Sequence, residues 1–177
     1  MSARAGRLRT RRARAWRQIE DHVQSYDVAR IIYGAIIGLA LVLALQVHPP
    51  SAAQIAGLVV ATAIAIGLAE LYSDIVGNQA RDRRPVSPER AHALAAQAAA
   101  ATLGAAFPAL FFVLAAGHAI SLALAFTLAK WSGLGLICGY GFIASRLAGS
   151  GIGRALVHAA LAGAVAGALI AFKALLH

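Results

Sequence analysis

The chain has 177 residues, of which 60% are hydrophobic and 13% charged, and its mean hydropathy is +0.71. A soluble domain carries roughly 45–50% apolar and about 25% charged residues, so this composition excludes an ordinary globular domain and a disordered chain. Only 7% of the residues are aromatic, so the apolar content is mostly small and aliphatic, which suits helices packed closely in lipid. The net charge of +9 is unusual for so apolar a chain, and its position along the sequence is therefore informative.

The first 27 residues are basic and precede every apolar segment. Trp16, Ile19, Val23 and Tyr26 recur at spacings of three and four, which places them on one face of a helix. We expect residues 1–27 to form an amphipathic helix at the cytoplasmic membrane surface, where anionic lipids attract basic side chains. A simpler interpretation is that these arginines only fix the topology. The candidate lipid-binding residues are Arg11, Arg12, Arg14, Trp16 and Arg17.

Five apolar segments follow, each long enough to cross a hydrocarbon core of about 30 Å as a helix. They cover about residues 28–47, 52–76, 91–116, 119–145 and 155–176. Turn-forming residues separate them, as in His48-Pro49-Pro50-Ser51. The segments lack the alternating pattern of barrel strands. The predicted fold is therefore an all-α integral membrane protein, with residues 1–27 as the leader and residues 28–177 as a five-helix membrane domain.

The arginines predict the orientation of these helices. With the N-terminus inside, residues 1–30, 79–90 and 146–154 face the cytoplasm and hold fourteen of the sixteen Lys and Arg residues. Positive charge in short loops marks the cytoplasmic side, so we expect an N-in, C-out protein of a bacterial-type inner (plasma) membrane. A cleaved signal is not expected, because four more apolar segments follow the first.

Three ionisable residues stand out within the predicted spans, where charge is costly and is by default a sign of function. Glu70 and Asp74 lie four apart and share one helix face, with Tyr72 between them in sequence. Two carboxylates on one face can hold a hard cation or pass protons, so both are tentative metal ligands. Lys130, near the middle of the fourth segment, could pair with Glu70. The predicted ion pathway comprises Glu70, Asp74, Lys130 and Tyr72.

Other motifs are weak. None of the six histidines has a partner at metal-ligand spacing, and the sequence has no nucleophile–base set, zinc motif or phosphate loop. We therefore expect no enzyme activity and no cofactor, and a divalent cation only as a transported substrate. The pairs Gly34/Gly38, Gly135/Gly139 and Gly163/Gly167 favour close helix packing. Pro108 predicts a kink in the third helix.

Several segments resemble the vacuolar iron transporter family. Residues 30–38 (Arg-Ile-Ile-Tyr-Gly-Ala-Ile-Ile-Gly) resemble its first-helix motif, and residues 69–71 (Ala-Glu-Leu) resemble the Gly-Glu-Tyr of its second helix. Residues 104–167 are similar to its last three helices. The resemblance implies that family's five-helix fold, a homodimer with a central pathway, and a functional role for Glu70.

The departures from the family pattern concern its metal ligands. Ile37 stands where the family has an acidic residue, and Met1 is the only methionine, so the membrane methionine ligand is missing. Residues 79–90 are short and basic, whereas the family has an acidic, Met-containing metal-binding insert there. The resemblance therefore implies a reduced member of the family, and it does not imply iron. The lack of Met and Cys ligands disfavours soft-ligand metal binding.

Two functions remain open from the sequence. One is a small cation or proton-coupled transporter. It would act as a homo-oligomer, most simply a dimer. Its expected partners are the bilayer and its anionic lipids, and no nucleic acid is expected to bind. The other is a non-transporting membrane scaffold or accessory protein, in which Glu70 and Lys130 form a structural ion pair.

Overall fold

The computed structural model describes residues 28–175, and every regular element in this part of the chain is an α-helix. The prediction of an all-α protein is thus confirmed for these residues. The predicted leader helix, with Arg11, Arg12, Arg14, Trp16 and Arg17, lies outside them. In chain order the elements are a first helix (Val28–Leu45), α2 (Ala52–Asp82), α3 (Pro88–Ala106), α4 (Ala109–Ala116), α5 (Leu122–Leu147) and α6 (Ile152–Leu175).

Serine residues fix where three of the helices begin. Ser51, Ser87 and Ser121 adopt extended backbone angles, and each hydroxyl accepts a hydrogen bond from the amide three residues later. At Ser51 the bond is reciprocal, because the Gln54 side chain accepts from the Ser51 amide at 3.0 Å. Such caps satisfy amides that have no partner inside the helix. The predicted fourth segment accordingly begins at Leu122 rather than at residue 119.

Helix α2 runs six residues beyond its predicted end at residue 76. The expected break at Gly77-Asn78 does not occur, because one glycine costs a helix only about 1 kcal/mol. The side chain of Asn78 also bonds back to the carbonyl of Asp74 at 2.7 Å, within the helix. The helix ends at Arg83, whose left-handed backbone (φ 50°) starts the turn toward α3.

The predicted third segment is a bent pair of helices rather than one straight helix. Helices α3 and α4 meet at 48°, with Phe107 and Pro108 between them. Proline has no amide hydrogen, so the carbonyl of Gly104 loses its helical donor and the axis bends there. The kink expected at Pro108 is confirmed.

Three helices of the described chain are long and apolar enough to cross a membrane: the first helix, α2 and α5. The bent α3–α4 pair makes a fourth if it counts as one span. Helix α6 is apolar over Ile152–Ala168, a shorter stretch. The described residues are thus compatible with a multi-pass membrane protein, whereas five spans and the N-in orientation remain predictions.

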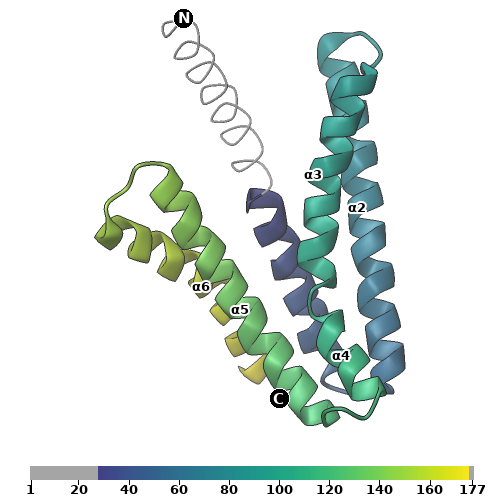
Figure 1. Cartoon of the computed structure of the whole chain (residues 1–177), viewed down its shortest axis with the longest axis vertical. Helices are drawn as coiled ribbons and strands as arrows, with labels where there is room; N and C mark the ends of the chain where they lie inside the picture. The colour runs from purple at the N-terminus through teal and green to yellow at the C-terminus, as the bar shows by residue number, and fades with distance from the viewer. Residues whose placement is uncertain (1–27, 176–177) are drawn as a thin grey trace, which may run out of the picture.

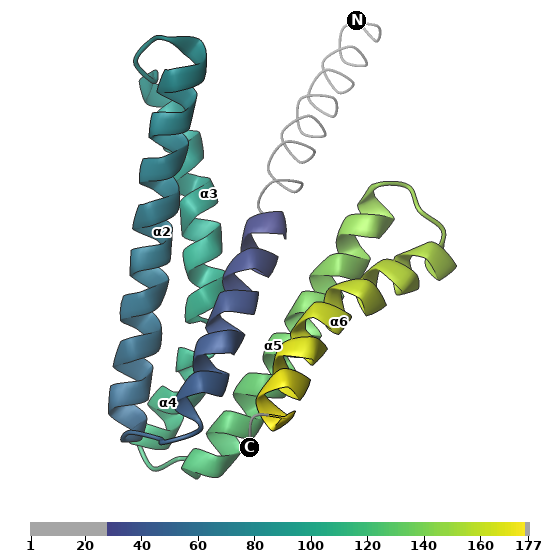
Figure 2. The ribbon, with the colours of Figure 1, turned by 180° about the vertical axis from the view of Figure 1, so that it is seen from behind.

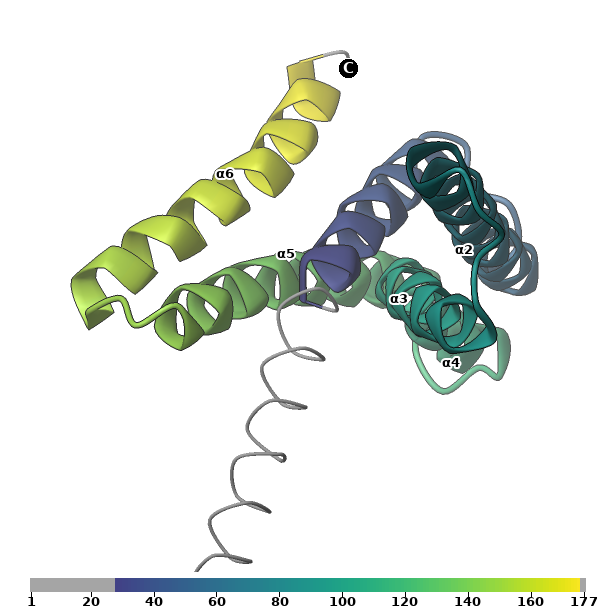
Figure 3. The same cartoon turned by 90° about the horizontal axis from the view of Figure 1, so that it is seen from above.

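The helices form two pairs with the first helix between them. Helices α2 and α3 stand side by side and antiparallel, whereas α5 and α6 form a second hairpin that leans away from them (Figures 1 and 2). The view from above shows the first helix between α6 on one side and the α2–α3 pair on the other (Figure 3). The two pairs converge at α4, the lower end in Figure 1.

Two hydrophobic clusters hold this arrangement together. At the lower end, Phe112 of α4 is fully buried and meets Phe126 of α5 edge to face, with ring centroids 4.9 Å apart. Val42 of the first helix and Ile55 of α2 belong to the same cluster. The second cluster joins the first helix to α5 and α6 through residues that include Leu39, Ile137 and Ala166. The first helix therefore packs against both pairs.

Glycines let the first helix approach α3 closely. A Cβ at Gly34 would overlap the carbonyl of Ala101, and one at Gly38 would lie 2.6 Å from the carbonyl oxygen of Ala105. Gly104 of α3 meets the carbonyl of Ile31 in the same way. By contrast, Gly135, Gly139 and Gly167 face open space, and Gly163 faces Cys138. Of the three predicted glycine pairs, Gly34/Gly38 is the one in which both members meet a neighbouring helix.

Candidate ion-binding site

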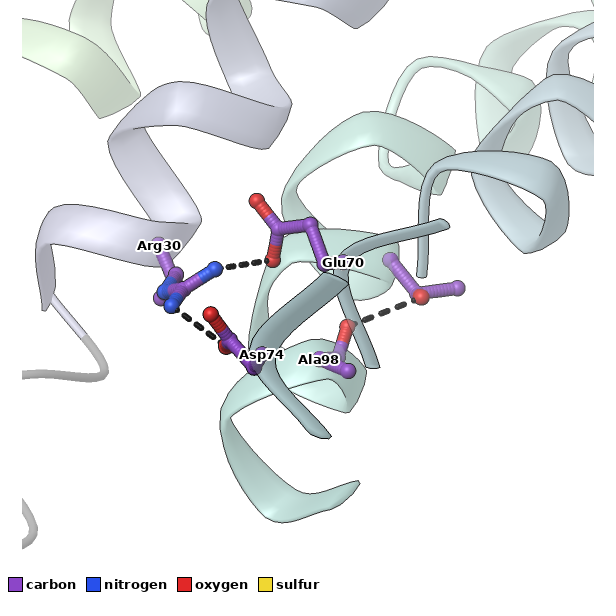
Figure 4. A network of polar contacts seen from close by, with 5 residues as sticks. Arg30, Glu70, Asp74 and Ala98 are labelled. Atoms are coloured by element: carbon purple, nitrogen blue, oxygen red, sulfur yellow. Dashed lines mark hydrogen bonds and ion pairs between the residues drawn. The ribbon is translucent and has the colours of Figure 1, made fainter. Parts of the chain in front are cut away.

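Two carboxylates of α2 face the beginning of the first helix. Glu70 and Asp74 are one turn apart on a helix that continues unbroken from Ala52 to Asp82, so their side chains project from the same face. Behind them, Gly67 gives α3 room to pack against α2, because a Cβ there would overlap the hydroxyl of Thr102. That hydroxyl is held by the carbonyl of Ala98 at 3.0 Å (Figure 4).

Arg30, from the first turn of the first helix, faces both carboxylates (Figure 4). Its Nη1 is 2.8 Å from Oε2 of Glu70, and its Nη2 donates a hydrogen bond to Oδ2 of Asp74 at 2.7 Å. The guanidinium thus uses two nitrogens on two different acids. We call Arg30, Glu70 and Asp74 the charged triad.

The triad is partly shielded from solvent. The side chain of Glu70 is 12% exposed, whereas those of Arg30 and Asp74 are each 26% exposed. Oε2 of Glu70 is buried, and it meets Arg30 as an ion pair without an aligned hydrogen bond. Glu70 is therefore the acid with the least water and the least complete hydrogen bonding. One guanidinium facing two carboxylates also leaves the triad with a formal charge of −1.

A cleft of about 420 Å³ opens beside the triad. All three triad residues line it, together with the Tyr33 ring. The rest of its wall comes from α2, namely Ile66, Ala69 and Ser73. The uncompensated negative charge therefore faces a space large enough for several water molecules or a hydrated cation.

The predicted pair of Glu70 with Lys130 is not formed, because Glu70 pairs with Arg30 instead. Lys130 is partly buried and makes no ion pair within residues 28–175. Helices α2 and α5 start at the same end of the molecule (Figure 1), and Glu70 is 18 residues from the start of α2 whereas Lys130 is 8 from that of α5. At about 1.5 Å per residue, the two differ in height by about 15 Å, which is beyond the reach of a lysine.

Tyr72, the other predicted pathway residue, does not line the cleft. Its side chain is 72% exposed. The aromatic residue at the cleft is Tyr33 of the first helix. Of the four predicted pathway residues, Glu70 and Asp74 are brought together, while Lys130 and Tyr72 lie apart from them.

A resident metal does not fit the triad as it stands. Glu70 and Asp74 are two oxygen-donor side chains, and the guanidinium of Arg30 occupies the position between them that a cation would take. Within residues 28–175, no three His, Cys, Asp or Glu side chains gather closely enough to hold a metal ion. A cation would therefore have to displace Arg30 to bind both carboxylates.

Arg30 is the residue that sequence reasoning missed. It belongs to the basic residues of segment 1–30, which predict the orientation of the helices. One signal could have found it, because the first predicted span begins at residue 28 and so already contains Arg30. A charge two residues inside a span needs a partner, and Asp74, two residues before the predicted end of the second span, offers one near the same boundary.

Comparisons of the chain with protein-family models, with curated protein sequences and with solved structures give no match. The resemblance to the vacuolar iron transporter family therefore remains a hypothesis.

Proposed function

We propose that this protein is a small membrane transporter for a cation, coupled to protons, in which the charged triad is the ion-binding site. The observation that carries the proposal is the position of Glu70, which is nearly buried, incompletely hydrogen-bonded and on the wall of an open cleft. Charged residues inside spans mark ion and proton pathways, because each costs about 2.5–3.5 kcal/mol to insert at a helix centre.

The length of α2 suggests the depth of the triad. Its 31 residues rise about 45 Å, close to the 40–45 Å thickness of a bilayer with its headgroups. Glu70 is about 27 Å and Asp74 about 33 Å from the start of α2. With α2 centred in the bilayer, Glu70 lies about 10 Å inside the hydrocarbon boundary and Asp74 only about 4 Å inside it. Asp74 thus forms the mouth of the proposed pathway, and Glu70 its deeper group.

Arg30 serves in this proposal as an internal cation that the transported ion replaces. With Arg30 in place, one carboxylate charge of the triad is neutralised and one attracts a cation into the cleft. The cation binds both carboxylates only when Arg30 swings away. Protonation of Glu70 removes one of the two negative charges and leaves Asp74 to pair with Arg30, so a proton gradient can drive release of the transported cation.

The wider proposal follows the resemblance to the vacuolar iron transporter family. It comprises a homodimer in a bacterial-type inner membrane, with the N-terminus in the cytoplasm and a divalent cation as substrate. Hard cations fit the carboxylates of Glu70 and Asp74 better than soft ones do.

A specific observation favours a second candidate, a non-transporting scaffold. Arg30 contacts both carboxylates at 2.7–2.8 Å, and such a contact ties the first helix to α2 without any ion. In that case the triad is a structural ion-pair network, and Arg30, rather than the expected Lys130, is the partner of Glu70.

Reconstitution separates the two candidates. The purified protein is placed in liposomes, and uptake of Fe²⁺, Mn²⁺, Zn²⁺ and protons is measured under a pH gradient, with protein-free liposomes as the control. Transport predicts gradient-dependent uptake of at least one of these ions above the control. Uptake equal to that of empty liposomes for all of them would leave the scaffold as the better description.

A further inference from the structure

A second pocket lies at the turn between α2 and α3, and its lining shares no residue with the cleft beside the charged triad. Its volume is about 460 Å³, and Arg84 and Arg90 are among the residues that line it. The remaining lining residues are Asn78, Asp82, Pro85, Val86 and Ser87. The left-handed backbone of Arg83 and the cap at Ser87 shape the turn that encloses this space.

Two arginines give this pocket its positive charge. Arg84 and Arg90 are exposed, and neither makes an ion pair within residues 28–175. Asp82 contributes one negative charge, so the charged groups that line the pocket sum to +1. The start of α3 adds little, because Ser87 already accepts from the amide of Arg90 at 3.3 Å and Glu89 carries a negative charge there.

The height of the pocket suggests its ligand. Helix α2 is about as long as a bilayer with its headgroups, so with α2 centred in the bilayer the turn after Asp82 lies at the level of the lipid phosphates. Planar guanidinium groups bind phosphate oxygens through paired N–H donors, and two of them at one pocket make a geometric site rather than a diffuse charge. We propose that Arg84 and Arg90 bind a phosphate group in this pocket, either the headgroup of an anionic phospholipid or a free phosphate.

The chain offers a matched control, because Arg81 and Arg83 lie in the same segment but outside the pocket lining. The double variants R84Q/R90Q and R81Q/R83Q each lose two positive charges at the same end of the α2–α3 hairpin. Binding of phosphatidylglycerol to the full-length protein in detergent is measured by titration, with phosphatidylcholine as the neutral lipid. A second arm uses inorganic phosphate, alone and as a competitor.

The proposal predicts that phosphatidylglycerol binds in preference to phosphatidylcholine, and that R84Q/R90Q weakens this binding about tenfold or more while R81Q/R83Q changes it less than about threefold. Competition by inorganic phosphate would support the site and identify a free phosphate as a sufficient ligand, whereas binding of the lipid alone would identify the headgroup. Equal losses in both double variants would overturn the proposal, because the attraction would then be diffuse. The proposal would also be overturned if the wild-type protein showed no preference between the two lipids. This result does not depend on how either variant folds.

Discussion

Nη1 of Arg30 and Oε2 of Glu70 lie 2.8 Å apart and join the first helix to α2. Removing the guanidinium leaves the carboxylate of Glu70, whose side chain is only 12% exposed, without a countercharge. Breaking a buried pair costs about 3–5 kcal/mol and breaking an exposed one less than about 1 kcal/mol. For this partly exposed pair, R30Q is expected to lower the free energy of unfolding in detergent by about 2 kcal/mol.

A double-mutant cycle shows whether that loss belongs to the pair. In R30Q/E70Q both charges are absent, so the double variant is expected to be more stable than the sum of the single losses implies, by about 1–2 kcal/mol. Strictly additive losses would mean that the 2.8 Å contact contributes nothing to stability.

Lys130 provides a contrasting case, because it makes no ion pair within residues 28–175. K130Q is expected to change the free energy of unfolding by less than about 0.5 kcal/mol. Its effect should also add to that of E70Q, since the two side chains are separated by about 15 Å in height. A coupling energy between Lys130 and Glu70 above about 0.5 kcal/mol in the same unfolding assay would contradict this separation and support the Glu70–Lys130 ion pair.

The crossing of the first helix over α3 depends on glycine. The variant G38A places a methyl group 2.6 Å from the carbonyl oxygen of Ala105, where only backbone movement can make room. Overpacking of this kind typically costs 1–3 kcal/mol, so the melting temperature should fall. G139A is the control, because a Cβ there meets open space and alanine favours the helix. A melting temperature of G38A equal to or above that of G139A would show that the two helices do not meet at Gly38.

Pro108 is expected to set the bend between α3 and α4. In P108A an amide hydrogen returns to the position that can bond the carbonyl of Gly104, so the two helices should straighten from their angle of 48°. Spin labels at His92 in α3 and Val113 in α4 report this change, and their separation should increase. An unchanged separation would assign the bend to packing around the fully buried Phe112 instead.

The sequence predicted the helices better than it predicted their partners. Apolar runs and Pro108 are local features, so the start of α2 at Ala52 and the kink at Pro108 could be expected. Helices α3 and α5 begin three residues from their predicted starts, because the caps at Ser87 and Ser121 set those positions. The extension of α2 to Asp82 was missed, because Gly77 and Asn78 are individually weak helix formers and yet do not end a long helix.

The composition of the triad was missed for a different reason. The spacing of Glu70 and Asp74 is local and was found, but their partner comes from another helix, 44 residues before Asp74 in the sequence. Its identity depends on which residues lie at the same height in the packed helices. Arg30 meets that condition, and Lys130, although deeper in a predicted span, does not.

The uptake rate of Glu70→Gln in liposomes tests most directly whether Glu70 binds the transported ion. The matched control is E89Q, which neutralises an exposed carboxylate in the first turn of α3, outside the cleft. E70Q is expected to lower gradient-driven cation uptake about tenfold or more, which corresponds to a rise of about 1.4 kcal/mol or more in the activation free energy, while E89Q stays near the wild-type rate. Uptake by E70Q at the rate of E89Q, with both variants folded, would contradict a role for Glu70 in transport.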